Sequence, residues 1–164
     1  MKRRLRNKAF LLPKGALLLF VACILTACDK HTVYHAFRPL PPEGWKQEET
    51  LFYDVAVPDS QTYYKLSVEI RHKSDYPYQN LNLTIGCEGP ENSQLPTDTL
   101  RLTLSDEKGK WKGKGWGGLY LADFPAGSIR IGRPGNYRFK ITHAFAVPSL
   151  SGISDVGIRL EPTD

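Results

Sequence analysis

Hydrophobic and polar residues alternate with a period of two along much of this chain after residue 50. In the run YYKLSVEIR, Tyr64, Leu66 and Val68 fall on one side, while Lys65 and Ser67 fall on the other. Such alternation is typical of a β-strand with one buried side and one solvent-facing side. The pattern recurs between proline, glycine and asparagine turn signals, which predicts strands at 50–57, 63–71, 81–87, 99–105, 137–145 and 156–161.

Strands that each carry one apolar and one polar face cannot all lie in a single open sheet, because the apolar face would then meet water. Two sheets that close over each other bury both apolar faces. The pattern therefore predicts an all-β protein, an antiparallel β-sandwich of immunoglobulin-like or jelly-roll-like type. Cys87 and His143 fall on inward positions, and residues 125–134 are expected to form a loop or a short strand around Ile129 and Ile131.

The N-terminus has a different character. Residues 1–14 carry six Lys and Arg and no acid, and residues 15–25 form an apolar run of eleven. A transmembrane helix needs about 20 apolar residues, so this run is too short to span a bilayer and fits a secretory signal peptide. It closes on Leu25-Thr26-Ala27-Cys28, which matches the bacterial lipobox. We therefore expect cleavage before Cys28 and attachment of a diacylglyceryl group, with acyl chains such as palmitate, to its thiol. The alternative is a plain signal peptide, or a buried N-terminal helix, in which Cys28 has no special role.

These features predict three segments: a lipoprotein signal peptide at 1–27, a lipidated N-terminus and tether at 28–48, and a single β-sandwich domain at 49–164. The tether is inferred from polar residues and from Pro39, Pro41 and Pro42. Two hydrophobic pairs within it are expected to form a first edge strand, Val33-Tyr34 and Ala36-Phe37.

Removal of the leader changes the charge of the chain. Six of the 22 Lys and Arg residues precede Cys28, which leaves 16 against 17 Asp and Glu, a net charge of −1 instead of +5. A basic face for nucleic acid is therefore not expected. The partner implied directly by the sequence is the lipid bilayer, because two or three acyl chains on Cys28 would anchor the protein stably.

No catalytic centre or cofactor site is indicated. Cys23 would leave with the leader and Cys28 would carry lipid, so Cys87 would remain as a free, core-packed thiol without a disulfide partner. There is no GxSxG elbow, no glycine-rich phosphate loop, and no HExxH or CxxC zinc pattern. His31 and His35 lie in the tether, where no helix would hold them together. We expect no catalytic residues, no metal and no cofactor, and hence no enzyme; a hydrolase with a cleft hidden from sequence reasoning is the alternative.

Two aromatic stretches are candidate contact sites. Residues 108–120 carry Trp111, Trp116 and Tyr120 among four lysines and five glycines, and residues 74–80 carry Tyr76 and Tyr78 around a proline. Exposed loop aromatics stack on sugars or on the side chains of a partner protein. In the alternative reading they pack against the core while the glycines form tight hairpins and bulges, and for Trp111 we favour this alternative.

Several segments carry a family resemblance. They are IRHKSDYPYQNLNLTI, PGNYRFKITHAF, LSGISDVGIRLE and, most specifically, the block D-T-L…D-x-x-G-x-W-x-G-x-G from Asp98 to Gly115. With the lipobox leader, they resemble the gliding motility lipoprotein GldH family of Bacteroidetes over residues 34–161. The resemblance implies an envelope-anchored accessory of the gliding machinery and its associated secretion apparatus, without enzymatic activity or cofactor. The one residue to which it assigns a role is Cys28, the lipid attachment point.

Two hypotheses of different classes follow. The first is a membrane-anchored, non-catalytic lipoprotein whose partners are envelope proteins of the gliding and secretion machinery. The second is a lipid-anchored glycan-binding module that uses Trp111, Trp116 and Tyr120 as a stacking platform.

The residue after the lipobox cysteine bears on the membrane location. Asp29 follows Cys28, an arrangement that signals inner-membrane retention in some bacteria. Because sorting rules differ between phyla, the location we expect is the periplasmic side of the outer membrane.

Overall fold

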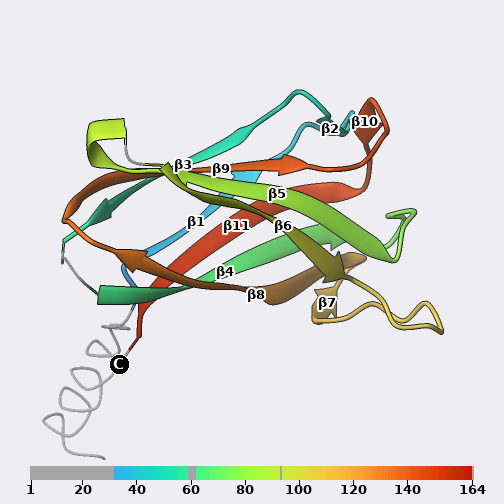
Figure 1. Ribbon diagram of the computed structural model, residues 1–164. Helices are drawn as coiled ribbons and strands as arrows, with labels where there is room; N and C mark the ends of the chain where they lie inside the picture. The colour runs from blue at the N-terminus through green and yellow to red at the C-terminus, as the bar shows by residue number, and fades with distance from the viewer. Residues whose placement is uncertain (1–31, 59–61, 93, 164) are drawn as a thin grey trace, which may run out of the picture. The chain divides into compact units, whose positions relative to one another are not determined.

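The computed structural model describes residues 32–58, 62–92 and 94–163. In these ranges the regular structure is β-strand apart from one short 3-10 turn, η1 (Pro90–Asn92), and Figure 1 shows the arrangement. The strands are β1 (Tyr34–Pro39), β2 (Trp45–Lys46), β3 (Leu51–Val57), β4 (Thr62–Lys73), β5 (Asn80–Glu88), β6 (Gln94–Thr103), β7 (Lys114–Trp116), β8 (Leu119–Ile131), β9 (Gly135–His143), β10 (Ser149–Leu150) and β11 (Ile153–Pro162).

Two sheets form the layers of a sandwich. A five-stranded sheet has the order β1-β11-β4-β8-β7, and a four-stranded sheet has the order β3-β9-β5-β6, while β10 and β2 form a small separate pair. Neighbouring strands are antiparallel in every pair. In Figure 1 the five-stranded sheet lies below the four-stranded one. The predicted all-β, antiparallel β-sandwich is confirmed.

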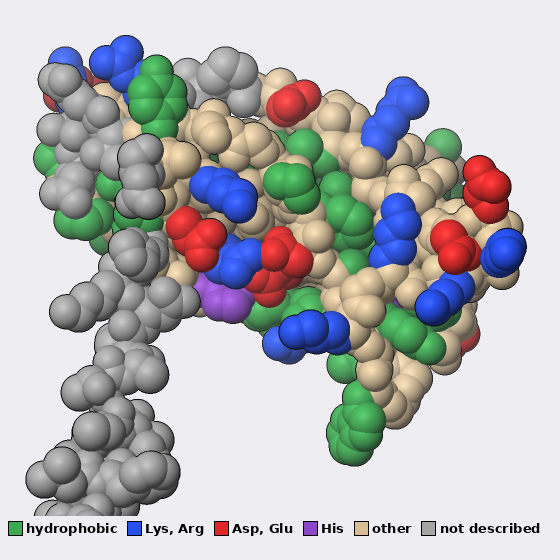
Figure 2. All heavy atoms as spheres, turned by 90° about the horizontal axis from the view of Figure 1, so that it is seen from below, with side chains coloured by type: hydrophobic (Ala, Val, Ile, Leu, Met, Phe, Trp, Pro, Cys, Tyr) green, Lys and Arg blue, Asp and Glu red, His purple; other side chains and the backbone are tan. Residues whose placement is uncertain are grey.

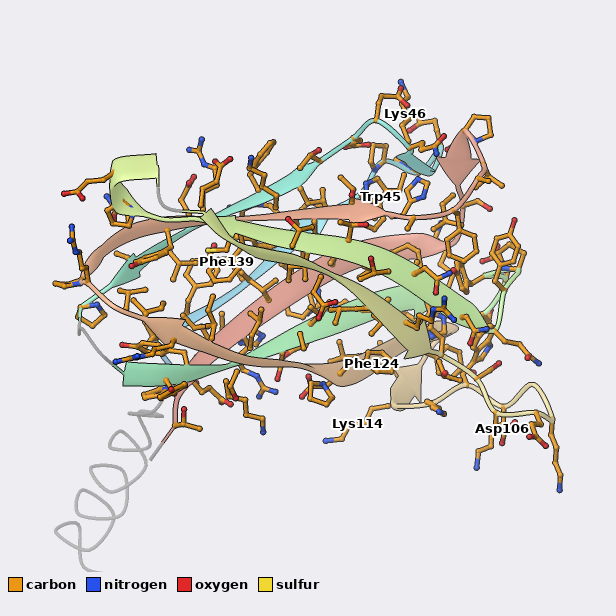
Figure 3. The ribbon with its side chains drawn as sticks, in the orientation of Figure 1. Trp45, Lys46, Asp106, Lys114, Phe124 and Phe139 are labelled. Carbon is orange, nitrogen blue, oxygen red and sulfur yellow. The ribbon has the colours of Figure 1, made fainter. Side chains whose placement is uncertain are left out.

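The core fills the space between these layers with the side chains that the alternation placed inward. Tyr53 of β3 is fully buried, and its hydroxyl donates a hydrogen bond of 2.7 Å to the carbonyl of Val156 on β11, which joins the two sheets. Figure 3 shows Phe139 between the sheets. Buried side chains follow the predicted parity in strand after strand: Leu51, Val55 and Val57; Tyr64, Leu66, Val68 and Ile70; Leu81, Leu83 and Ile85; Ile158 and Leu160.

Most of the segment assigned to the tether belongs to the sandwich, which corrects the predicted boundary at residue 48. The expected first edge strand is present as β1, paired with β11 from Tyr34 to Pro39. Trp45 is 0% exposed, and its indole N–H donates to the carbonyl of Glu49 at 2.9 Å. The prolines that suggested a tether terminate β1 and form a turn, in which the amide of Gly44 donates to the carbonyl of Pro41 at 3.0 Å.

In the segment 125–134, the alternative of a strand around Ile129 and Ile131 is the correct one, but the strand is longer than expected, because residues 125–131 are the second half of the long strand β8. Pro125 lies opposite Ser67, where the register between β4 and β8 shifts. Proline lacks an amide hydrogen, so it is tolerated at a bulge or on an edge strand. Residues 122–131 of β8 have no strand beyond them among the described residues, and β8 therefore accommodates this proline.

Both inward polar positions are confirmed. His143 is buried, its Nε2 donates to the carbonyl of Trp45 at 3.1 Å, and its ring meets the Trp45 ring edge-on at 5.3 Å. Cys87 is a buried free thiol, and burial raises its pKa to about 12. No helix among the described residues is long and apolar enough to cross a bilayer.

Candidate functional site

The β7–β8 hairpin lies at one end of the five-stranded sheet and presents Trp116 to solvent. Gly117 and Gly118 form its two-residue turn with φ of +60° and +82°. Hairpin turns of this kind require left-handed backbone at both positions, which glycine adopts without strain. The amide of Ser74, just beyond β4, donates to the carbonyl of Gly118 at 2.8 Å, so the turn is fastened to the sheet. Trp116 pairs with Leu119 across the turn and is 92% exposed.

The two faces of this hairpin have different roles. Successive residues of a strand point to opposite sides, so Tyr120 lies on the face opposite Leu119 and Leu121. The Tyr120 ring rests on Gly115, where an added Cβ would lie 2.5 Å from the ring. The absence of a side chain at Gly115 lets Tyr120 pack closely, and the hairpin is thereby held by one face while the other remains open.

Tyr120 packs into an aromatic cluster around His72. The His72 ring is fully buried and lies 5.5 Å from the Tyr120 ring in a stacked arrangement, 4.6 Å from Trp111 and 5.9 Å from Tyr76. Its Nδ1 donates to the carbonyl of Lys73 at 3.0 Å, which assigns the ring proton to Nδ1. Burial lowers the pKa of His72, so the imidazole is held neutral. This cluster is a packed base for the hairpin.

Tyr76 and Tyr78 differ in exposure, although their rings meet edge-on at 5.7 Å. Tyr76 is 3% exposed, and its hydroxyl donates to the carbonyl of Asn80 at 2.9 Å. Burial raises the pKa of this hydroxyl. The expectation that Tyr76 is a surface contact is therefore wrong, because its ring packs beneath the loop against His72. Tyr78 is partly exposed and lies 4.9 Å from the Phe145 ring.

The three aromatics of the predicted glycan platform do not share one surface. Trp111 is half-buried against the core, as we favoured from the sequence, and its ring lies 6.2 Å from that of Tyr120. Both belong to the His72 cluster, whereas Trp116 lies on the open face of the hairpin. A ligand that stacks on Trp116 would not reach the other two rings.

A shallow groove adjoins Trp116 on the open face. It has a volume of about 300 Å³ and is lined by Arg71, Lys114, Gly115, Trp116, Leu119 and Leu121. Register explains this lining, because Lys114, Leu121 and Arg71 form one row across β7, β8 and β4, and Trp116, Leu119 and Lys73 form the next. Figure 3 shows Lys114 projecting from β7 away from the core. Sequence reasoning singled out only Trp116 here; the Gly117-Gly118 pair was the signal that could have set this register.

A charged network on the same sheet face was also missed. Glu69 of β4 is buried, with one carboxylate oxygen 3.2 Å from His35 Nε2 and the other 3.3 Å from Arg159 Nε. Arg159 also pairs with Asp123 of β8. Figure 2, which views the molecule from the side of this sheet, shows acidic and basic side chains gathered beside a histidine. Both oxygens of Glu69 are occupied by basic partners, so the network is a stabilising cross-strand link.

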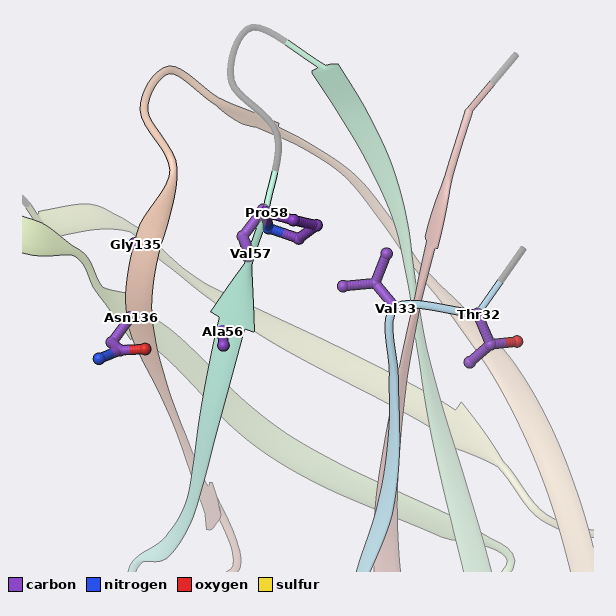
Figure 4. A pocket seen from close by; sticks show the side chains of 7 residues that line it. All are labelled: Thr32, Val33, Ala56, Val57, Pro58, Gly135 and Asn136. Carbon is purple, nitrogen blue, oxygen red and sulfur yellow. The ribbon is translucent and has the colours of Figure 1, made fainter. Parts of the chain in front are cut away.

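Two further hollows lie elsewhere. One of about 430 Å³, shown in Figure 4, is bounded by Val33, Val57, Pro58 and Asn136 and has no titratable side chain in its lining. The other, of about 580 Å³, lies where β8 faces β5 and β6 and includes Cys87 in its lining. In the part of the chain that the structure describes, no three His, Cys, Asp or Glu side chains are grouped as metal ligands would be.

The predicted lipid attachment point, Cys28, lies outside the described residues, as does His31. The first described residue, Thr32, is four positions after Cys28 and borders the 430 Å³ hollow. The chain therefore enters the sandwich at the end where β1 begins.

Comparison with known proteins identifies close sequence relatives. The model of the GldH lipoprotein family matches residues 32–160. A gliding motility lipoprotein GldH homolog of Christiangramia forsetii is 27% identical over 154 residues, covering 89% of this chain and 93% of that protein. Gliding motility lipoprotein GldH of Flavobacterium johnsoniae is 28% identical over 162 residues, covering 92% of this chain and 97% of that protein.

Similarity to solved structures is weaker. A 4-O-methyl-α-glucuronidase of glycoside hydrolase family 115 aligns with a TM-score of 0.44 and 11% identity, covering 84% of this chain and 18% of that one. We base no functional argument on this alignment.

Proposed function

Because the chain belongs to the GldH lipoprotein family, a family of gliding motility lipoproteins, we propose that it is a non-catalytic accessory of the gliding machinery and its associated secretion apparatus. The observation that carries the proposal is the position of the family match. It begins at residue 32, four residues after the lipobox cysteine Cys28, so the sequence motif for lipid attachment directly precedes the matched domain.

We propose that acyl chains on Cys28 anchor the protein at the periplasmic side of the outer membrane. Two or more chains give stable attachment where a single chain gives only marginal binding. The four-residue link from Cys28 to Thr32 reaches at most about 14 Å when fully extended. It would keep the β1 end of the sandwich close to the lipid headgroups.

A non-catalytic role is supported by the environments of the side chains that most often do chemistry. Burial raises the pKa of the Cys87 thiol to about 12, so at neutral pH it is a thiol and not a thiolate nucleophile. The imidazoles of His72 and His143 both donate to backbone carbonyls inside packed aromatic contacts. These groups contribute to packing and hydrogen bonding in the core.

The test is complementation in the native bacterium with the gene removed. Wild-type protein should restore colony spreading and secretion, and its intact mass should show an acylated chain that starts at Cys28. Cys28→Ala should leave the membrane fraction and restore neither property. Unimpaired motility and secretion in the deletion strain, or an unmodified Cys28 thiol in the native protein, would overturn the proposal.

A further inference from the structure

Resting on the proposed function, we propose that the open face of the β7–β8 hairpin is the docking surface for an acidic segment of a partner protein in the cell envelope. This hairpin surface consists of Arg71, Lys73, Lys114, Trp116, Leu119 and Leu121. It combines an exposed tryptophan, two leucines and three cations around one shallow groove.

The hairpin that carries this surface is fastened to the sheet by contacts within the protein. Gly117 and Gly118 set the turn, the Gly118 carbonyl accepts the amide of Ser74, and the back of the hairpin is packed on the His72 cluster through Tyr120. The Trp116 side chain itself packs little against the rest of the protein, since it is 92% exposed. A large aromatic side chain on a preorganised base is the kind of residue that dominates the energy of protein interfaces.

The charge around the hairpin surface indicates the kind of partner that would bind there. Residues 106–114 contain four lysines against Asp106 and Glu107, an excess of two positive charges, although the chain after the leader has a net charge of −1. Arg71 is 4.0 Å from Asp155, while Lys73 and Lys114 take part in no ion pair among the described residues. A local positive patch on a slightly acidic protein favours a partner segment that carries Asp and Glu beside an apolar side chain.

The location of the patch favours a protein over the anchoring membrane. Tyr34 of β1 pairs with Leu160 of β11, which in turn pairs with Leu66 of β4. At the other end of β4, Lys73 pairs with Leu119 of β8. The seven residue steps from Leu66 to Lys73 span about 23 Å at 3.3 Å per residue, so the hairpin lies at the end of the sheet away from Thr32. Laying the sheet flat on anionic lipid would also bring carboxylates of this face to the headgroups: Asp123, Asp155 and Glu161.

A glycan is disfavoured by the same geometry. Sugar platforms use aromatic rings that lie side by side, and here Trp111 and Tyr120 are committed to the cluster on the other face. A single tryptophan with leucines and cations beside it fits an amphipathic acidic peptide better.

The experiment is photo-crosslinking of the full-length lipidated protein in its native cells. Trp116 is replaced by p-benzoylphenylalanine, and Phe52, which is 45% exposed on the four-stranded sheet, is replaced in a matched control. We expect irradiation to join position 116, but not position 52, to one protein, at a peptide rich in Asp and Glu. Adding Lys114→Glu should lower the yield by at least roughly tenfold. Arg101→Glu, an exposed charge reversal on β6, should leave it unchanged.

Adducts of lipid or polysaccharide at position 116, crosslinks to a peptide without acidic residues, or equal yields with and without Lys114→Glu would overturn this inference. Its failure is distinguishable from failure of the proposed function. If Cys28→Ala abolishes spreading and secretion while position 116 crosslinks to no protein, the anchored accessory role stands and the docking surface does not. If the deletion strain is unaffected, the proposed function fails whatever the crosslinks show.

Discussion

Replacing Trp45 by alanine is expected to destabilise the protein strongly, because this side chain belongs to the core and not to a tether. Trp45 is fully buried beside His143, and its indole N–H bonds to the Glu49 carbonyl. Truncating a buried tryptophan to alanine costs about 3–5 kcal/mol from lost burial and the cavity that remains. That is a large share of the roughly 5–15 kcal/mol that stabilises an ordinary domain.

The assay is urea unfolding of the chain from residue 29, followed by far-ultraviolet circular dichroism. With a slope of about 2 kcal/mol per molar urea, the expected loss lowers the midpoint by about 1.5–2.5 M. Trp116→Ala is the matched control, because it removes the same side chain from a position that is 92% exposed. It should change the unfolding free energy by less than about 0.5 kcal/mol.

A midpoint for Trp45→Ala within error of the wild-type midpoint would refute this reasoning. Residues 40–48 would then contribute little to the fold, and the boundary of the sandwich would move back toward residue 49. A loss of similar size in both variants would instead refute the assignment of Trp116 to the open face of the hairpin.

Three further outcomes are expected. Because burial lowers the pKa of His72, the unfolded chain binds more protons just below pH 6.5, so stability should fall as pH falls from 7 toward 5. This histidine contributes at most about 1.4 kcal/mol per pH unit, and denaturation of His72→Gln across that range should show a shallower slope. Glu69→Ala should cost about 1–3 kcal/mol in urea unfolding, since it removes the buried carboxylate that links His35 and Arg159, whereas Asp54→Ala at an exposed pair should have a much smaller effect; equal losses would contradict the network. The Cys87 thiol should react with a thiol-specific reagent at pH 8 many times more slowly in the native protein than in urea, and equal rates would mean that it is not buried.

The sandwich itself could be predicted from the sequence because its long strands have one buried and one exposed face. Alternation in 63–71 and 81–87 gave the correct inward side, Cys87 included. The two-residue strand that carries Trp45 is too short for any period, and neighbouring prolines made the segment resemble a linker. In β8, Pro125 and the register shift interrupt the alternation, so the sequence predicts only a loop or a short strand there.

For the candidate site, the sequence predicted which aromatic residues to consider but not how they are arranged. The sequence favoured a packed Trp111 but left Trp116 open between core and surface, and only the hairpin register shows that Trp116 is exposed. Tyr76 and Tyr78 flank one proline without a period, so their burial could not be distinguished. The link from Glu69 to Arg159 depends on pairing β4 with β11, which are 90 residues apart in the chain, and a single sequence does not reveal that pairing.

The edge position of β1 has a mechanical consequence. If the acyl anchor holds the chain before Thr32 and a partner pulls on the hairpin at the opposite edge of the sheet, part of the tension runs along the strand axes. The six residue pairs between β1 and β11 then resist in shear and share the load, whereas a pull from the side would open them one after another.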